Sequence, residues 1–160
     1  MVRNATKDDV SQIADIYNYY ILNTTVTFEK TPISHDIIEE RITQNQVKYP
    51  WLVLENEGQI QGYAYATEWK PRGAYRHSVE ATVYLKDGKS GNGYGSKLYS
   101  ELINQLKKLN VHTVIGGIAQ PNEESIALHE KFGFKKVAHF KEVGYKFDQW
   151  VDVAYWQLIL

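Results

Sequence analysis

The sequence predicts an α/β protein, and three observations indicate it. Segments with apolar residues at helical spacing alternate along the chain with short segments rich in β-branched and aromatic residues. Two pairs of the strand-like segments follow one another directly, as the strands of hairpins do. A glycine-rich stretch, residues 89–96, separates an apolar strand-like run from an amphipathic run. Because the 160 residues contain no linker and no internal repeat, we expect a single domain over residues 1–160.

The composition excludes several classes of protein. With no cysteine, the chain has no disulfide, no thiolate nucleophile and no Cys-based zinc site, and we expect no metal. A net charge of −1 provides no basic field for nucleic acid. No apolar run approaches the roughly 18 residues that span a bilayer. Residues 1–4 lead directly into polar sequence without a signal peptide, so we expect a cytoplasmic protein with no membrane partner.

The first elements predicted are a short strand and a helix. Residues 2–5 are read as the strand, and Thr6 with Asp9 forms a capping box before the helix. The helix ends near Leu22. Its apolar residues recur at helical spacing: Val10, Ile13, Ala14, Tyr17, Tyr20 and Ile21. Residues 23–28 are β-branched and polar, which indicates a loop or an extended connector.

A second helix and a hairpin are predicted next. Ser34 marks the start of the helix, which stops before Pro50. Its predicted inner face consists of Ile37, Ile38 and Ile42. Residues 51–54 and 60–66 then form the two strands of a hairpin around the turn 56–58.

The middle of the chain contains a loop, a strand and a long helix. Residues 68–76 include a proline, a glycine and three cations, which indicates a loop. Residues 78–85 are an apolar strand that leads into the glycine stretch. The amphipathic helix that follows covers residues 94–109. It is expected to bury Leu98, Leu102, Ile103 and Leu106.

The last third of the chain is predicted to hold one helix and three strands. Residues 112–119 are β-rich, and Asn122 can cap a helix that ends near Lys131. Residues 134–143 and 147–160 are read as two closing strands. The predicted order is therefore β-α-α-β-β-β-α-β-α-β-β, with hairpins at both ends and one or two crossovers in the middle.

The glycine stretch is either a surface turn or an anion site. At a strand-to-helix junction, unpaired backbone N–H groups and the helix dipole favour an anion. The Walker A pattern fails, because Lys97 follows Ser96 and precedes Leu98. The Rossmann fingerprint fails too, because the glycine spacing is wrong and the strand at 112–119 has no acidic residue for a ribose.

The pattern Ser90-x-x-Gly93-x-Gly95 is similar to the coenzyme A pyrophosphate loop of the GCN5-related N-acetyltransferases (GNAT), with Ser90 in place of the usual Gln or Arg. That change removes one side-chain contact to phosphate but leaves the backbone donors. Residues 122–134 resemble the second cofactor segment of the same family. The resemblance implies the family's fold, a central, mixed, mostly antiparallel sheet flanked by helices.

A narrower resemblance covers most of the chain. Residues 25–28, 62–66, 69–75, 79–84 and 152–158 look like the phosphinothricin acetyltransferase branch. That branch acetylates the free α-amino group of small amino-acid analogues such as phosphinothricin, methionine sulfoximine or methionine sulfone. The resemblance therefore implies acetyl-CoA as co-substrate, and a homodimer. With no cysteine to carry the acetyl group, we expect direct attack by the amine in a ternary complex.

The resemblance also implies which residues bind the cofactor. Backbone groups of the strand before the glycine loop would pair with the pantetheine arm, and loop N–H groups would hold the pyrophosphate. The residues concerned are Val83, Tyr84, Leu85, Gly91, Asn92, Gly93, Tyr94, Gly95 and Ser96. Asn122 would contact the pantetheine; it could also be a plain helix cap, and both roles can hold at once.

Glu80 is the candidate general base. It is the only acid in the apolar run 78–85, and a carboxylate on a buried strand is costly unless it is paired or functional. Partial desolvation would raise its pKa toward a useful value. The alternative is a Glu on a solvated face, paired with Arg76 or Lys86.

His129 is the candidate general acid for the leaving thiolate. It lies where many members of the family carry a Tyr, and an imidazole can donate a proton there. The alternative is a structural or merely exposed histidine. His77 is a weaker competitor because it is only close to Glu80 in sequence.

The acceptor's carboxylate requires cations. Arg72 and Arg76 flank the loop that would form the cleft, Arg suits bidentate binding of a carboxylate, and Lys70 is a third option. Phe28, Trp69 and Tyr75 could form the walls; in the family, the connector between the first two helices covers the substrate. The alternative is an ordinary surface loop with core or surface aromatics.

Two rival functions remain open. Acetylation of a peptide N-terminus or of a polyamine is the first, although a polyamine would require an acidic pocket, and the cations at 70–76 argue against one. A non-catalytic acyl-CoA-binding module is the second. Such a module would keep its function when Glu80 is replaced by Gln.

Overall fold

The fold is a seven-stranded sheet with helices on both faces, seen in a computed structural model that describes residues 1–160. The order of strands and helices predicted above is confirmed. The strands are β1 (Val2–Asn4), β2 (Trp51–Asn56), β3 (Gln59–Glu68), β4 (Ser78–Leu85), β5 (Thr113–Ala119), β6 (Lys135–Lys146) and β7 (Gln149–Ile159). The helices are α1 (Val10–Asn23), α2 (His35–Gln46), α3 (Tyr94–Lys108) and α4 (Glu123–Lys131), with short 3-10 turns η1 (Lys7–Asp9) and η2 (Gly73–Tyr75).

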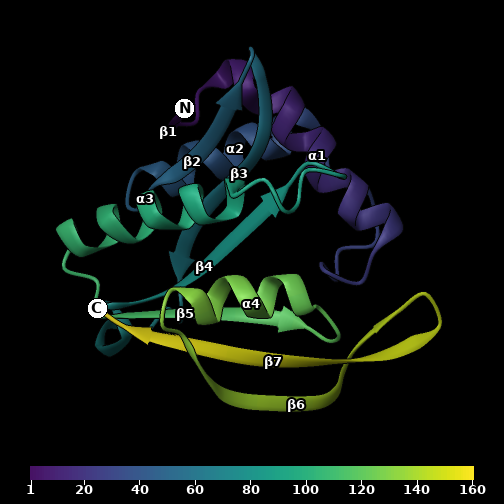
Figure 1. The fold of residues 1–160 in the computed structure, drawn as a ribbon, viewed down its shortest axis with the longest axis vertical. Helices are drawn as coiled ribbons and strands as arrows, with labels where there is room; N and C mark the ends of the chain where they lie inside the picture. Colours follow the sequence, from purple (N-terminus) through teal and green to yellow (C-terminus); the bar gives the residue numbers. More distant parts are fainter.

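The sheet is mixed and mostly antiparallel, as predicted. Its strand order is β1-β2-β3-β4-β5-β7-β6, and only the β4–β5 pair is parallel. Figure 1 shows α3 and α4 in front of the sheet and the β6–β7 hairpin reaching beyond the other strands. None of the helices combines the length and apolar character that crossing a membrane requires.

Two apolar cores lie on opposite faces of the sheet. One contains the inner face of α3, with Leu98, Leu102 and Leu106 fully buried against residues such as Ala64 and Val114. The other lies under α1 and α2 and includes an aromatic cluster at Tyr17, Tyr63 and Tyr84. Strand alternation assigns neighbouring side chains of β4 to the two cores in turn.

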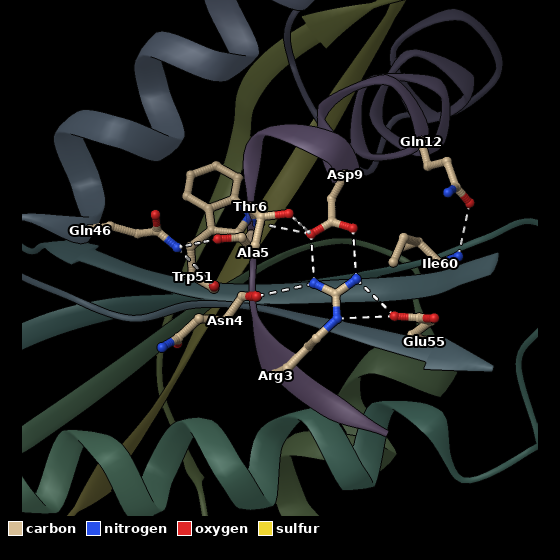
Figure 2. Close-up of polar contacts among 10 residues, drawn as sticks. All are labelled: Arg3, Asn4, Ala5, Thr6, Asp9, Gln12, Gln46, Trp51, Glu55 and Ile60. Atoms are coloured by element: carbon tan, nitrogen blue, oxygen red, sulfur yellow. Dashed lines mark hydrogen bonds and ion pairs between the residues drawn. The ribbon is translucent and has the colours of Figure 1, made fainter. Parts of the chain in front are cut away.

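One polar cluster joins the start of the chain to the sheet (Figure 2). The guanidinium of Arg3 donates to both carboxylate oxygens of Asp9, at 2.7 and 2.8 Å, and to Glu55 at 2.8 and 3.0 Å. Asp9 also accepts from the backbone N–H of Thr6, which completes the predicted capping box. A partly buried cation is thus satisfied by two carboxylates, as buried charge requires.

Two sequence predictions about the elements are wrong in detail. Ile37 was expected on the inner face of α2, but its side chain is 43% exposed, because the buried stripe follows the i, i+4 pair Ile38 and Ile42. The strand predicted to end at residue 143 continues to Lys146. The pairing with β7 shifts register between Phe140 and Gly144, so a bulge lengthens the strand.

Candidate active site

The candidate site is a wedge where β4 and β5 separate. The two strands pair only through Ser78↔Thr113, Val79↔Val114 and Glu80↔Ile115. Beyond this point β4 continues beside β3, while β5 continues beside β7. A cavity of about 760 Å³ lies beyond the split, between the end of β4, the glycine loop and α4. That volume falls in the range of small-molecule sites.

The edge of β4 that faces the wedge has free backbone groups. The N–H of Lys86 donates to Gln61 O at 2.8 Å, which fixes the alternation of hydrogen bonds along the β3–β4 ladder. Even-numbered residues, including Tyr84, therefore point their backbone groups toward β3, and odd-numbered residues such as Val83 point theirs into the wedge. An amide chain lying in the wedge could pair with Val83 as an added strand would.

The glycine loop exposes a row of backbone donors. Gly91 and Gly93 have φ of 80° and 74°, a left-handed conformation that favours glycine, and Gly93 is the N-cap of α3. The N–H groups of residues 91–96 have no acceptor in the protein. They lie at the N-terminus of a 15-residue helix, where the dipole favours negative charge. This arrangement suits a phosphate or pyrophosphate.

The two predicted cofactor motifs touch each other. A Cβ built on Gly95 would lie 3.2 Å from Leu128, so glycine lets the start of α3 approach α4 closely. Lys131 Nζ donates to Ser96 Oγ at 2.9 Å. Asn122 accepts from the N–H of Ser125 at 3.1 Å as the cap of α4, and it also lines the cavity, so its two predicted roles are compatible.

The structure brings the predicted cofactor residues together, with one exception. Those that line the cavity are Val83, Tyr84, Leu85, Gly91, Gly93, Tyr94, Gly95, Ser96 and Asn122. Asn92 does not line it; its side-chain amide donates to the carbonyls of Lys89 and Ser90 and so folds the loop.

Several other residues line the cavity that sequence reasoning did not assign to the cofactor. They are Tyr20, Val26, Pro121, Glu124, Ser125, Ala127, Leu128 and Lys131, and Ser90 of the loop motif lines it as well. Five of them lie inside the second motif, and Glu124, Ala127, Leu128 and Lys131 follow one another at the helical spacing of a single face, which could have indicated them. Tyr20 and Val26 come from the other face of the sheet, and no local pattern marks them. Tyr20 donates to Leu85 O at 2.6 Å.

Glu80 lies at the last paired residue before the wedge opens. Its side chain is half-buried and forms no ion pair. In the structure Glu80 therefore pairs with neither Arg76 nor Lys86, the alternative considered above. One carboxylate oxygen lies above Gly117 of β5, 3.4 Å from where a Cβ would be. Burial raises the pKa of Glu80 above its usual range, the shift expected of a carboxylate that must accept a proton near neutral pH.

His129 is buried on the face of α4 that packs against β5. Its Nδ1–H donates to Ser125 O at 2.6 Å, so Nε2 accepts from the Tyr99 hydroxyl at 2.7 Å. Burial lowers its pKa. It does not line the cofactor cavity, and glycine at 116 is required because a Cβ there would overlap the imidazole. This geometry favours the structural alternative over the predicted general acid.

The predicted acceptor residues are not gathered in one cavity. Arg72, Tyr75 and Arg76 are exposed on the loop between β3 and β4, and neither arginine forms an ion pair. Phe28 lies on the connector between α1 and α2, with its ring against Gly144 of β6. The loop and the connector approach β4 from opposite ends.

Comparisons with known proteins agree with this geometry. Residues 2–155 match the model of the acetyltransferase (GNAT) domain. The phosphinothricin N-acetyltransferase of Streptomyces viridochromogenes is 38% identical over 156 residues, which cover 98% of this chain and 85% of that protein. The L-methionine sulfoximine/L-methionine sulfone acetyltransferase of Salmonella typhimurium is 34% identical, with coverage of 99% and 94%.

A solved structure is similar over the whole chain. It is a phosphinothricin acetyltransferase from Sinorhizobium meliloti in complex with acetyl-CoA, with a TM-score of 0.96 and 35% identity, covering 100% of this chain and 88% of that one. The chain therefore belongs to the GNAT acetyltransferase family and is an N-acetyltransferase. The family resemblance inferred from the two motifs is confirmed.

Proposed function

We propose that this enzyme moves the acetyl group of acetyl-CoA to the α-amino group of a small amino-acid analogue of the phosphinothricin, methionine sulfoximine or methionine sulfone type. The observation that carries the proposal is Glu80, a half-buried carboxylate without an ion-pair partner at the point where the cofactor wedge opens. The activities named for the similar proteins of Streptomyces viridochromogenes and Salmonella typhimurium support the class of acceptor.

The residues of the wedge suit acetyl-CoA. The donors of residues 91–96 would hold the pyrophosphate, Val83 would pair with the pantetheine arm, and Asn122 would contact that arm with the side-chain nitrogen its capping bond leaves free. When bound, acetyl-CoA supplies the acetyl group as a thioester, whose carbonyl carbon the free amine attacks and whose thiol leaves. Both substrates would be bound together, because no cysteine can carry the acetyl group.

Glu80 would act as the general base. An α-ammonium group cannot attack, so one proton must leave before the new N–C bond forms. The carboxylate of Glu80 would accept that proton directly or through a water, and its raised pKa brings it closer to the operating pH. Arg72 and Arg76, cations without ion-pair partners, would attract the carboxylate of the acceptor, with Phe28 and Tyr75 as walls.

A homodimer in the cytoplasm is part of the proposal. The support for the homodimer is the β6–β7 hairpin, which ends the sheet and carries apolar side chains that are more than half exposed. They are Val137, Phe140, Val143, Phe147 and Trp150. Apolar patches of this kind commonly mark contacts with another chain.

The test is a thiol-release assay with acetyl-CoA and a panel of amino-acid analogues, run with wild type and Glu80→Gln. We expect activity on methionine sulfone or phosphinothricin, and a fall in kcat of about a hundredfold or more in the variant. The wild-type rate should fall as pH drops through a pKa above the ordinary Glu value of about 4.3, because the protonated carboxyl cannot accept the amine proton. The rate of Glu80→Gln should not show this fall at low pH.

Glu68→Gln is the matched control, because Glu68 ends the neighbouring strand and pairs with Lys48 at the surface. Its kcat should equal that of wild type. Unchanged turnover in Glu80→Gln would refute the base assignment. Activity on spermidine but on no α-amino acid would overturn the acceptor, and no turnover of any amine by wild type would favour a non-catalytic acyl-CoA-binding module.

A further inference from the structure

The segment between α1 and α2, residues 24–34, has no regular structure of its own and borders the active site. Val26 lines the cofactor cavity together with Tyr84 of β4. Phe28, two residues further on, is a proposed acceptor contact. We call residues 24–34 the connector. Apart from one helical bond at each end, Thr24 N–H to Tyr20 O and Ile38 N–H to Ser34 O, it has no regular backbone hydrogen bonds, so its position depends on the side chains that hold it.

The first anchor of the connector is a carboxylate held from two helices. Arg41 of α2 donates to both oxygens of Glu29, at 2.7 and 3.1 Å. The hydroxyl of Tyr17 on α1 donates to Glu29 and lies 3.0 Å from Thr27 Oγ1. A bidentate guanidinium–carboxylate pair fixes direction as well as distance. Both side chains are partly exposed, at 42% and 33%, so the pair has only a modest energy.

The second anchor comes from the opposite side, at the end of β6. Lys146 is 1% exposed, and its ammonium donates to the carbonyl of Thr27 at 2.8 Å. No carboxylate lies within ion-pair distance of it, unlike Arg3, which two carboxylates satisfy (Figure 2). Gly144 leaves room for the ring of Phe28, which any side chain there would displace. The hairpin thus fixes residues 27 and 28 directly.

The first anchor lies beside the candidate base. Arg41, Tyr17 and Tyr65 line one cavity of about 350 Å³ under α1 and α2. Tyr65 is on β3, two residues before Thr67 and on the same face of the strand, and the partner of Thr67 on β4 is Glu80. Burial raises the pKa of Tyr65, while its hydrogen bond with Thr82 and the charge of Arg41 act in the opposite direction.

We infer that Glu29, Arg41 and Lys146 are positioning residues that clamp the connector over the acceptor, with Phe28 held as its wall. The inference rests on the proposed function for its account of the acceptor. The clamp has two sides. The ion pair with Tyr17 holds residues 27–29 to the helices, and Lys146 holds the same residues to the hairpin. Loosening either side should weaken binding of the acceptor more than binding of acetyl-CoA, because the cofactor is held mainly by the wedge.

The kinetic test uses Glu29→Gln, Arg41→Gln and the double exchange Glu29→Arg with Arg41→Glu. Each single variant should raise KM for the acceptor about fivefold, which corresponds to ~1 kcal/mol, with KM for acetyl-CoA unchanged. The charge-swapped double variant restores opposite charges at the same two positions, so its KM for the acceptor should return most of the way to the wild-type value. Glu39→Gln is the control, because it breaks another α2 ion pair, with Lys7, that does not include the connector.

Hydrogen exchange of residues 24–34 tests the clamp without any catalysis. The single variants and Lys146→Met should speed exchange there about fivefold while the amides of β3 and β4 stay protected as in wild type. The clamp would be overturned if hydrogen exchange in residues 24–34 were unchanged in these variants. It would also be overturned if the charge-swapped double variant had a KM for the acceptor as high as the single variants, or if KM for acetyl-CoA rose equally. If wild type acetylates no amino-acid analogue, the proposed function fails, and exchange still decides whether the clamp exists.

Discussion

At the scale of single residues, burial acts on two titratable groups in opposite ways. It raises the pKa of Glu80 and lowers that of His129, so both are pushed toward the neutral form. The difference lies in their partners. Glu80 has no ion pair and lies at the opening of the wedge, whereas both nitrogens of His129 are already bonded. Glu80 therefore has an oxygen free to meet a substrate, whereas His129 is enclosed in the core at 3% exposure.

We therefore expect His129→Gln and Tyr99→Phe to affect stability rather than turnover. Each leaves a buried polar group without its partner, which costs about 1–2 kcal/mol and lowers Tm by about 4 °C. In wild type, stability should also fall as pH drops below the unfolded His value of about 6.5, since the unfolded chain then binds a proton that the buried ring resists. That loss should be absent in His129→Gln.

Thermal unfolding from pH 5 to 8, beside the thiol-release assay, measures both effects. Turnover within about threefold of wild type is the expected result for the two variants. A hundredfold fall in kcat with Tm unchanged would instead restore His129 as the general acid.

At the scale of elements, the site depends on a contact between two helices and a separation of two strands. Parallel pairing of β4 and β5 stops after three residue pairs, which frees the backbone of Val83. The start of α3 then approaches α4 at Gly95 and Leu128, so the glycine loop and Asn122 line one cavity. The glycine at 95 serves close packing, whereas those at 91 and 93 serve backbone conformation.

Gly95→Val should weaken cofactor binding specifically. Its side chain would press on Leu128 and move α3 away from α4, and overpacking of this kind costs roughly 1–3 kcal/mol. We expect Kd for coenzyme A, measured by titration calorimetry, to rise about tenfold. Ser100→Val is the control, because it places the same side chain on an exposed position of α3. Equal affinities for the two variants would contradict this role of Gly95.

At the scale of the whole molecule, the sequence predicted the features that depend on neighbouring residues and missed those that depend on distant ones. The element order and the positions of the glycine loop and of the isolated acid Glu80 were readable from spacing, whereas their expected roles came from the family resemblance. The clamp was not, because Lys146 meets Thr27 across 119 residues and neither position carries a local signal. The bulge in β6 and the outward position of Ile37 were also missed, because the first depends on the pairing with β7 and the second on which face of α2 packs against the core. Contacts in three dimensions, rather than residue type, distinguish the surroundings of Glu80 from those of His129.

The exposed β6–β7 hairpin also predicts how the molecule assembles. The edge strand β6 and its hairpin expose Val143 at 60% and Trp150 at 63%, and an exposed apolar edge favours pairing with another chain. Light scattering at about 100 μM should give the mass of a dimer, because burying such side chains contributes roughly 1.5–3 kcal/mol each. Val143→Lys with Trp150→Lys should give a monomer, since it places two charges in the contact. The matched control, Lys107→Ala with Lys108→Ala at the end of α3, should remain dimeric. A monomeric wild type at that concentration would refute the homodimer, and a double lysine variant that remains dimeric would place the interface elsewhere than on the hairpin.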